Sequence, residues 1–162
     1  AMRHYAVVLL SVIACCIVSC DSLVPPEPVG FTGVRGTITF VGGEAGWPSD
    51  TILDMRVVLF EKAPAAADSI LPFILSGRAA FGSSIPLRVA GAPYLVEVSN
   101  APREFGYVVV AMQTGPNVLQ DWRMAALYSL DGTTPAPVAI RRGQEVQLNF
   151  TVDFSNLPPQ PF

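Results

Sequence analysis

The segment EVQLNFTVDF, residues 145–154, alternates between polar and apolar side chains along its whole length. The apolar positions are Val146, Leu148, Phe150, Val152 and Phe154. A period of two puts successive side chains on opposite faces of an extended chain, so the segment is predicted to be a half-buried β-strand. This periodicity does not fit an amphipathic helix, and it makes an all-β fold the leading expectation.

Other segments support this expectation. Residues 34–40 and 94–99 also alternate, whereas 55–60 and 105–112 are apolar on both faces, as interior strands are. Residues 122–130 could form a strand or a short helix. A strand is favoured, because its inward face would hold Trp122, Met124, Ala126, Tyr128 and Leu130. Short strands between Gly, Pro and Asn turns indicate an antiparallel β-sandwich. Residues 63–77 are open to two interpretations, a short helix after Asp68-Ser69 or an irregular crossing loop.

The chain begins with a pattern that is typical of a secretory signal peptide, predicted over residues 1–19. A short basic start, Met2-Arg3-His4, precedes an apolar run that ends near Val18 and falls short of the ~20 residues of a membrane-spanning helix. Residues 20–33 contain three prolines and are predicted as an extended tether. The β-domain is then predicted over 34–154, and residues 155–162 form a proline-rich tail.

The three cysteines of the chain, Cys15, Cys16 and Cys20, all lie in or directly after the apolar run. A metal site or a disulfide would need partners elsewhere in the chain, and no later cysteine or histidine exists. Ile17-Val18-Ser19-Cys20 instead resembles the lipobox of bacterial lipoproteins, which implies acylation of Cys20 and a membrane anchor in the bacterial cell envelope. The segment ending at Cys15 also fits the lipobox pattern, but only Cys20 stands where the hydrophobicity ends.

Composition narrows the function classes. Removal of residues 1–19 takes the net charge from −3 to −4 and leaves no basic cluster, which argues against nucleic-acid binding. It also removes the only histidine, His4, and with it Ser-His and Cys-His catalysis. The commonest catalytic machinery and His- or Cys-ligated metal sites are therefore missing from the predicted mature chain, and we expect no cofactor and no metal. A hydrolase that works with carboxylates alone stays a distant alternative.

Four stretches together resemble carboxypeptidase-regulatory-like domains in order and spacing. They are VRGTITF, MRVVLFEKAP, YLVEVSNAPREFGYVVVAM and VQLNFTVDF, which span residues 34–154. The resemblance implies an Ig-like (transthyretin-like) sandwich of about seven strands. It also implies a non-catalytic binding or structural module rather than an enzyme. The insertion at 63–83 and the loop TGPNVLQDW depart from the family pattern.

The loop before the 122–130 strand is the predicted recognition surface, because loops on rigid sandwiches often carry function. Its candidate residues are Asn117, Asp121, Trp122 and Arg123. The structural alternative is an Asp121–Arg123 ion pair that orders the turn. Trp47 is the second candidate, either as an aromatic contact for a ligand such as a sugar ring or as a plug for the end of the sandwich.

Two functions follow from these features. The first is a lipid-anchored binding or structural module of the bacterial cell envelope. The second is an accessory subunit of an envelope complex for glycan or nutrient uptake. The expected partners are the membrane, through the lipid, and another envelope protein or a glycan. A calcium site formed by Glu44, Asp50 and Asp54 is a minor alternative, because their spacing does not match the D-x-D-x-D-G calcium loop.

Overall fold

A computed structural model describes residues 30–162, so the predicted signal peptide and Cys20 lie outside the described residues. The described chain has ten strands, one short α-helix and two 3-10 turns, at Gly43–Gly46 and Ala67–Ser69. The helix, α2, spans Ile70–Leu75. The strands are β1 Gly33–Phe40, β2 Asp54–Phe60, β3 Ala79–Phe81, β4 Gly91–Glu97, β5 Arg103–Phe105, β6 Tyr107–Gln113, β7 Trp122–Leu127, β8 Val138–Ile140, β9 Glu145–Gln147 and β10 Phe150–Val152.

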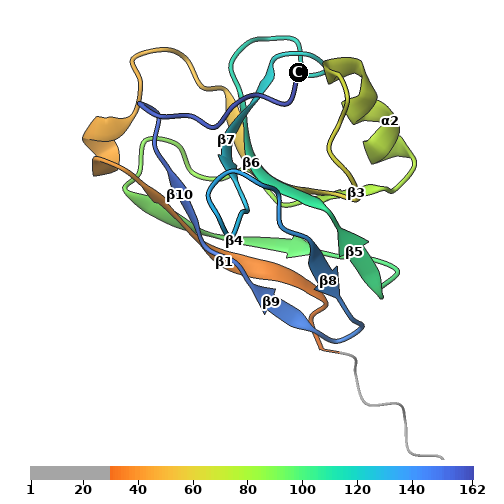
Figure 1. The fold of residues 1–162 in the computed structure, drawn as a ribbon. Helices are drawn as coiled ribbons and strands as arrows, with labels where there is room; N and C mark the ends of the chain where they lie inside the picture. The colour runs from red at the N-terminus through yellow and green to blue at the C-terminus, as the bar shows by residue number, and fades with distance from the viewer. Residues whose placement is uncertain (1–29) are drawn as a thin grey trace, which may run out of the picture.

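The strands form two four-stranded sheets and a small ribbon of β5 and β8 (Figure 1). One sheet is antiparallel throughout, in the order β3-β2-β6-β7. In the other, β1 pairs antiparallel with β4 but parallel with both β9 and β10. The all-β prediction is confirmed, while the expectation of purely antiparallel pairing is wrong for β1. Among the described residues, the single α-helix is too short to cross a membrane.

The main hydrophobic core lies between the two sheets. Alternate residues of β1 and β4, such as Ile38 and Val96, meet alternate residues of β2 and β6, such as Leu59 and Val110. All four are fully buried. The predicted inward positions of the last strand region, from Val146 to Phe154, also pack into or against this core.

A second apolar cluster explains why β2 and β6 are apolar on both faces. Val58 and Phe60 of β2 point away from the main core, toward Tyr107 of β6 and Phe73 of α2. Phe60 and Phe73 meet edge to face, with ring centroids 5.7 Å apart. The helical interpretation of the 63–77 segment is therefore confirmed, and its buried face covers the outside of the β3-β2-β6-β7 sheet.

The inward face predicted for residues 122–130 needs correction. Ala111 pairs with Met124, whereas Val110 pairs with Ala126, so Ala125 is an extra residue in β7. Such a bulge shifts the alternation by one residue. Met124 therefore belongs to the outer cluster and Ala126 to the main core, and Leu130 lies beyond the strand with 85% of its surface exposed.

The single strand predicted over 145–154 is divided into β9 and β10 at Leu148. The Leu148 carbonyl accepts a hydrogen bond from the buried Tyr94 hydroxyl at 2.7 Å, and its N–H donates to the Arg35 carbonyl. The Asn149 side chain accepts a bond from the Thr37 N–H at 2.9 Å. The Leu148 carbonyl lies so close to Gly36 that a Cβ at Gly36 would overlap it. Gly36 is therefore required by close backbone packing.

Gly36→Ala is expected to destabilise the domain by about 3 kcal/mol, because the new methyl group must displace the Leu148 carbonyl between β9 and β10. Gly30→Ala is the matched control, since nothing lies within 4 Å of a Cβ there. That variant should stay within about 0.5 kcal/mol of the parent. Urea unfolding of the chain from Ser22 measures both, and equal stability of the two variants would contradict the close packing at Gly36.

Candidate functional site

The predicted recognition loop joins β6 to β7 and is ordered by its own side chains. The Asp121 carboxylate accepts a bond from the Asn117 N–H at 2.8 Å, and the Asn117 side chain accepts one from the Leu119 N–H at 3.0 Å. The Thr114 N–H donates to the Asp121 carbonyl at 2.8 Å. Asn117 and Asp121 thus shape the loop from within.

Arg123 does not take part in this ordering. None of the ion pairs within residues 30–162 joins Asp121 to Arg123, so the predicted pairing is wrong. The reason is that the carboxylate of Asp121 turns back to the Asn117 backbone. Arg123 is exposed at the start of β7.

Trp47 is buried, with 8% of its surface exposed. Its ring packs against Phe40 and Phe154, at centroid distances of 4.5 and 4.9 Å, and its Nε1 donates to the Val89 carbonyl. The side chain therefore closes one end of the main core. It presents no open ring face for a ligand.

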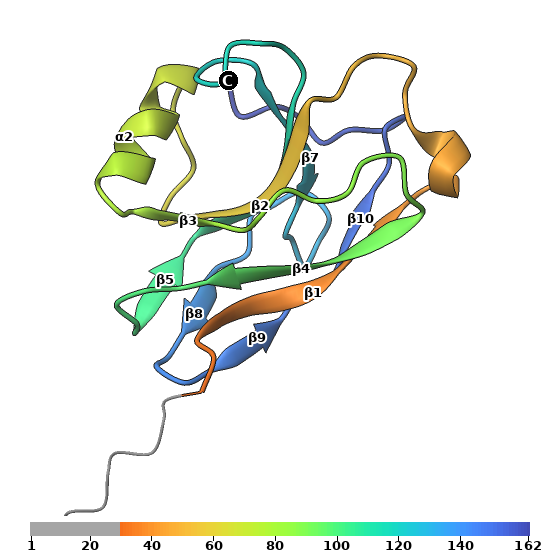
Figure 2. The same ribbon diagram turned by 180° about the vertical axis from the view of Figure 1, so that it is seen from behind.

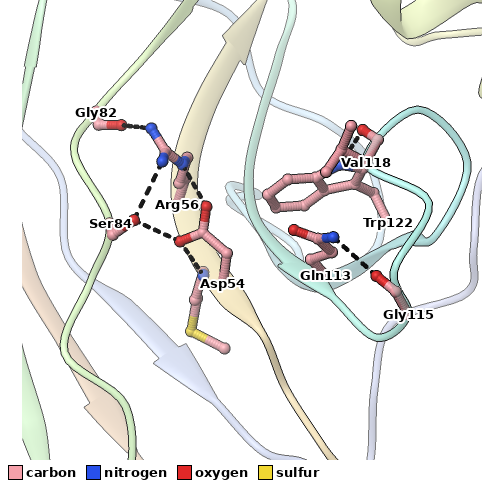
Figure 3. Close-up of polar contacts among 9 residues, drawn as sticks. Asp54, Arg56, Gly82, Ser84, Gln113, Gly115, Val118 and Trp122 are labelled. Carbon is pink, nitrogen blue, oxygen red and sulfur yellow. Dashed lines mark hydrogen bonds and ion pairs between the residues drawn. The ribbon is translucent and has the colours of Figure 1, made fainter.

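Trp122 is less buried than Trp47. It is half-buried at the start of β7, and its Nε1 donates to the Val118 carbonyl at 2.8 Å. This bond ties the ring to the loop and turns it over the outer face of the sheet (Figure 3). Strand register places Asp54, Gln113 and Trp122 in one row across β2, β6 and β7.

A groove of about 270 Å³ runs over this face, between the Trp122 loop and α2. Its walls and floor are mainly apolar and come from β2, β3, α2 and the loop. The lining residues are Asp54, Arg56, Val58, Phe60, Ile70, Ile74, Phe81, Gln113, Val118 and Trp122. Several of these are well exposed for apolar residues, among them Val118 at 61% and Phe81 at 47%. Exposed apolar surface of this kind marks interaction sites.

The polar end of the groove is a closed network around Asp54 (Figure 3). The Asp54 carboxylate accepts bonds from Arg56 Nε at 2.6 Å and from the Ser84 hydroxyl at 2.6 Å. Arg56 also donates to Ser84 Oγ and to the Gly82 carbonyl. The network links β2 to the segment that follows β3.

Charge and hydrogen bonding fix the protonation state of Asp54. Partial burial tends to raise the pKa of this carboxyl, but the bonds from Ser84 and Arg56, the charge of Arg56 and the Met55 N–H together hold it below its usual value. A general acid needs the opposite shift. The Asp54–Arg56 pair is suited to hold geometry and to offer the remaining N–H groups of a guanidinium to a ligand.

Gln113 lies on the floor of the groove, between Asp54 and Trp122. It is a polar side chain with only 7% of its surface exposed, and its Nε2 donates to the Gly115 carbonyl at 2.7 Å. This bond holds the first turn of the loop against β6. A Cβ at Gly115 would overlap the Asp121 carboxylate, so a side chain there would require that carboxylate to shift.

Part of this site was predicted from the sequence. The sequence indicated the loop and Trp122, but it gave no sign that Arg56 and Ser84, 28 residues apart, share a network with Asp54. Only the alternation of β2, which places Asp54, Arg56 and Val58 on one face, could have suggested an exposed polar end. The partner strands were needed to reveal the groove.

Within residues 30–162, no three His, Cys, Asp or Glu side chains are grouped so that they could hold a metal ion. Glu44, Asp50 and Asp54 are thus not brought together as a calcium site. We expect the melting temperature of the chain from Ser22 to be unchanged by EDTA or by a reductant. A thermal melt by circular dichroism measures this, and a drop of several degrees with EDTA would contradict it.

No protein-family model matches this chain, and no similar curated protein or solved structure was found.

Proposed function

We propose that this chain is a lipid-anchored, non-catalytic binding module of the bacterial cell envelope, and that the groove beside Trp122 is its binding surface. The lipobox resemblance at Cys20 supports the anchor. The two sheets with a core between them are compatible with an Ig-like, transthyretin-like sandwich of the carboxypeptidase-regulatory type. Such domains are mostly binding or structural modules.

The observation that carries the proposal is the position of the groove relative to the start of the domain. The described chain enters through β1, which belongs to one sheet, and the groove lies on the outer face of the other sheet. Figures 1 and 2 show the first described residues at the opposite end of the molecule from α2. A lipid ahead of β1 would leave the groove directed away from the membrane.

The chemistry of the groove favours a protein partner. Aromatic and aliphatic walls with a single guanidinium at one end resemble the core of a protein interface, where aromatic residues and Arg are enriched. Val118, Ile74 and Phe81 are exposed on the rim. Their burial by a partner would remove apolar surface from water, which is the main driving force of association.

Two neighbouring residues of α2 give a matched test. Ile74 lines the groove, whereas Leu75 is 77% exposed and lies outside it. A photoreactive residue at position 118 should cross-link the chain to one envelope protein in its native cells. Ile74→Glu should abolish the cross-link, and Leu75→Glu should preserve it. Cross-linking that survives Ile74→Glu, or that arises equally from position 95 on the other sheet, would contradict the proposed surface.

A further inference from the structure

The C-terminal tail is held at the free edge of β7. Because β7 is the last strand of its sheet among residues 30–162, one side of its backbone has no neighbouring strand in that part of the chain. The Met124 N–H donates to Gln160 Oε1 at 2.7 Å, and Gln160 Nε2 donates to the Met124 carbonyl at 3.0 Å. One amide side chain thus makes the pair of bonds that a neighbouring strand would make.

Apolar contacts hold the tail on both sides of Gln160. Leu157 packs against the main core. Pro161 and Phe162 lie over the outer cluster together with Trp122 and Phe60, and only about 40 Å³ of space is left between them. Three features of the tail are thus in contact with the domain, namely an apolar residue, a central amide and a proline followed by a second apolar residue.

The same pattern occurs a second time in the chain. The tail segment, residues 157–162, reads LPPQPF, and residues 24–29 of the tether read VPPEPV. The three prolines, the polar residue between them and the apolar ends all correspond. Proline-rich segments of this kind favour the extended polyproline conformation, which needs little further ordering when it binds.

We infer that the edge of β7 is a docking site for this six-residue pattern, and that residues 24–29 of a second copy of the chain compete with the tail for it. The tether segment ends one residue before Gly30, and the first described residues lie at the opposite end of the molecule from the C-terminus (Figures 1 and 2). This separation limits binding within one copy, but it does not limit binding to the β7 edge of a neighbouring copy. Exchange of the two segments links one copy to the next.

The polar residue sets which segment is bound. Gln160 uses both a donor and an acceptor toward Met124. Glu27 stands at the corresponding position, and an ionised carboxylate accepts hydrogen bonds but donates none. It would face the Met124 carbonyl without a proton to share. The tail is therefore the stronger ligand, and only a small fraction of the parent chains is expected to exchange the two segments.

Exchanging the two polar residues should reverse this preference. In the chain from Ser22, which contains both segments, Gln160→Glu weakens the tail and Glu27→Gln strengthens the tether. The double variant is expected to self-associate at least about tenfold more tightly than the parent in sedimentation equilibrium, the effect of one hydrogen bond. A synthetic VPPQPV peptide should return it to monomer.

Two controls separate exchange from misfolding. Adding Pro25→Ala and Pro26→Ala to the double variant should restore the monomer, because proline is the residue that favours the extended conformation needed for binding, while the described fold is untouched. Aggregation through an unfolded state would persist in that variant. A double variant that stays monomeric, or one that associates regardless of the tether prolines, would overturn the inference.

Discussion

Phe150→Ala is expected to destabilise the domain by about 3–5 kcal/mol, as truncations of buried aromatic residues do. Phe150 is 4% exposed, and its ring lies 5.9 Å from that of Tyr94. It also aligns with Ile38 in the parallel pairing of β10 with β1. The loss would leave a cavity between the sheets. Because a typical domain is stable by only ~5–15 kcal/mol, the variant should be close to unfolding at 37 °C.

The neighbouring residue Thr151 is the control. It is exposed on the outer face of the same strand, so Thr151→Ala should change the stability by less than about 0.5 kcal/mol. Asn149 is a poorer control despite its exposure, because its side chain accepts the Thr37 N–H. Asn149→Ala is expected to cost about 1 kcal/mol. Urea unfolding of the three variants decides, and similar losses for Phe150 and Thr151 would contradict the assignment of buried and exposed faces.

Periodicity in the sequence predicted the strands but not their neighbours. The alternation of residues 145–154 identified the buried side chains correctly, because burial of one face is what the pattern records. Nothing in that pattern indicates that β9 and β10 run parallel to β1. Strand pairing depends on how segments distant in the sequence pack together. Here Gly36 leaves space for the Leu148 carbonyl, and the Tyr94 hydroxyl donates a hydrogen bond to it.

The bulge in β7 and the shortest strands could not be predicted from the sequence, because neither leaves a periodic pattern. The bulge at Ala125 shifts the faces of β7, yet alanine fits either face, so the local sequence gives no sign of it. The short strands β3, β5 and β8 have three residues each, which is too few to show a period.

The candidate site was predicted in part. The loop and Trp122 could be identified as a candidate recognition surface because aromatic and polar residues are concentrated there. The actual surface also requires the outer face of β2, where Asp54, Arg56 and Val58 alternate, and α2 as the opposite wall. That arrangement depends on long-range packing.

The largest functional effect is expected from Cys20→Ala, which should abolish both processing and membrane attachment. Each buried methylene of an acyl chain contributes ~0.8 kcal/mol to membrane binding, and two or more chains make the anchoring stable. Within the described residues 30–162, no helix offers a spanning substitute. The variant should accumulate as an unprocessed precursor. Cys15→Ala and Cys16→Ala should be processed and fractionate with membranes like the parent.

The most direct test of a lipid-anchored envelope module is mass spectrometry of the chain recovered from bacterial membranes. We expect a mature chain that starts at Cys20, carries its acyl groups on that residue and lacks residues 1–19. A chain that still begins at its original N-terminus, or one acylated at Cys15 with residues 16–19 retained, would contradict this expectation.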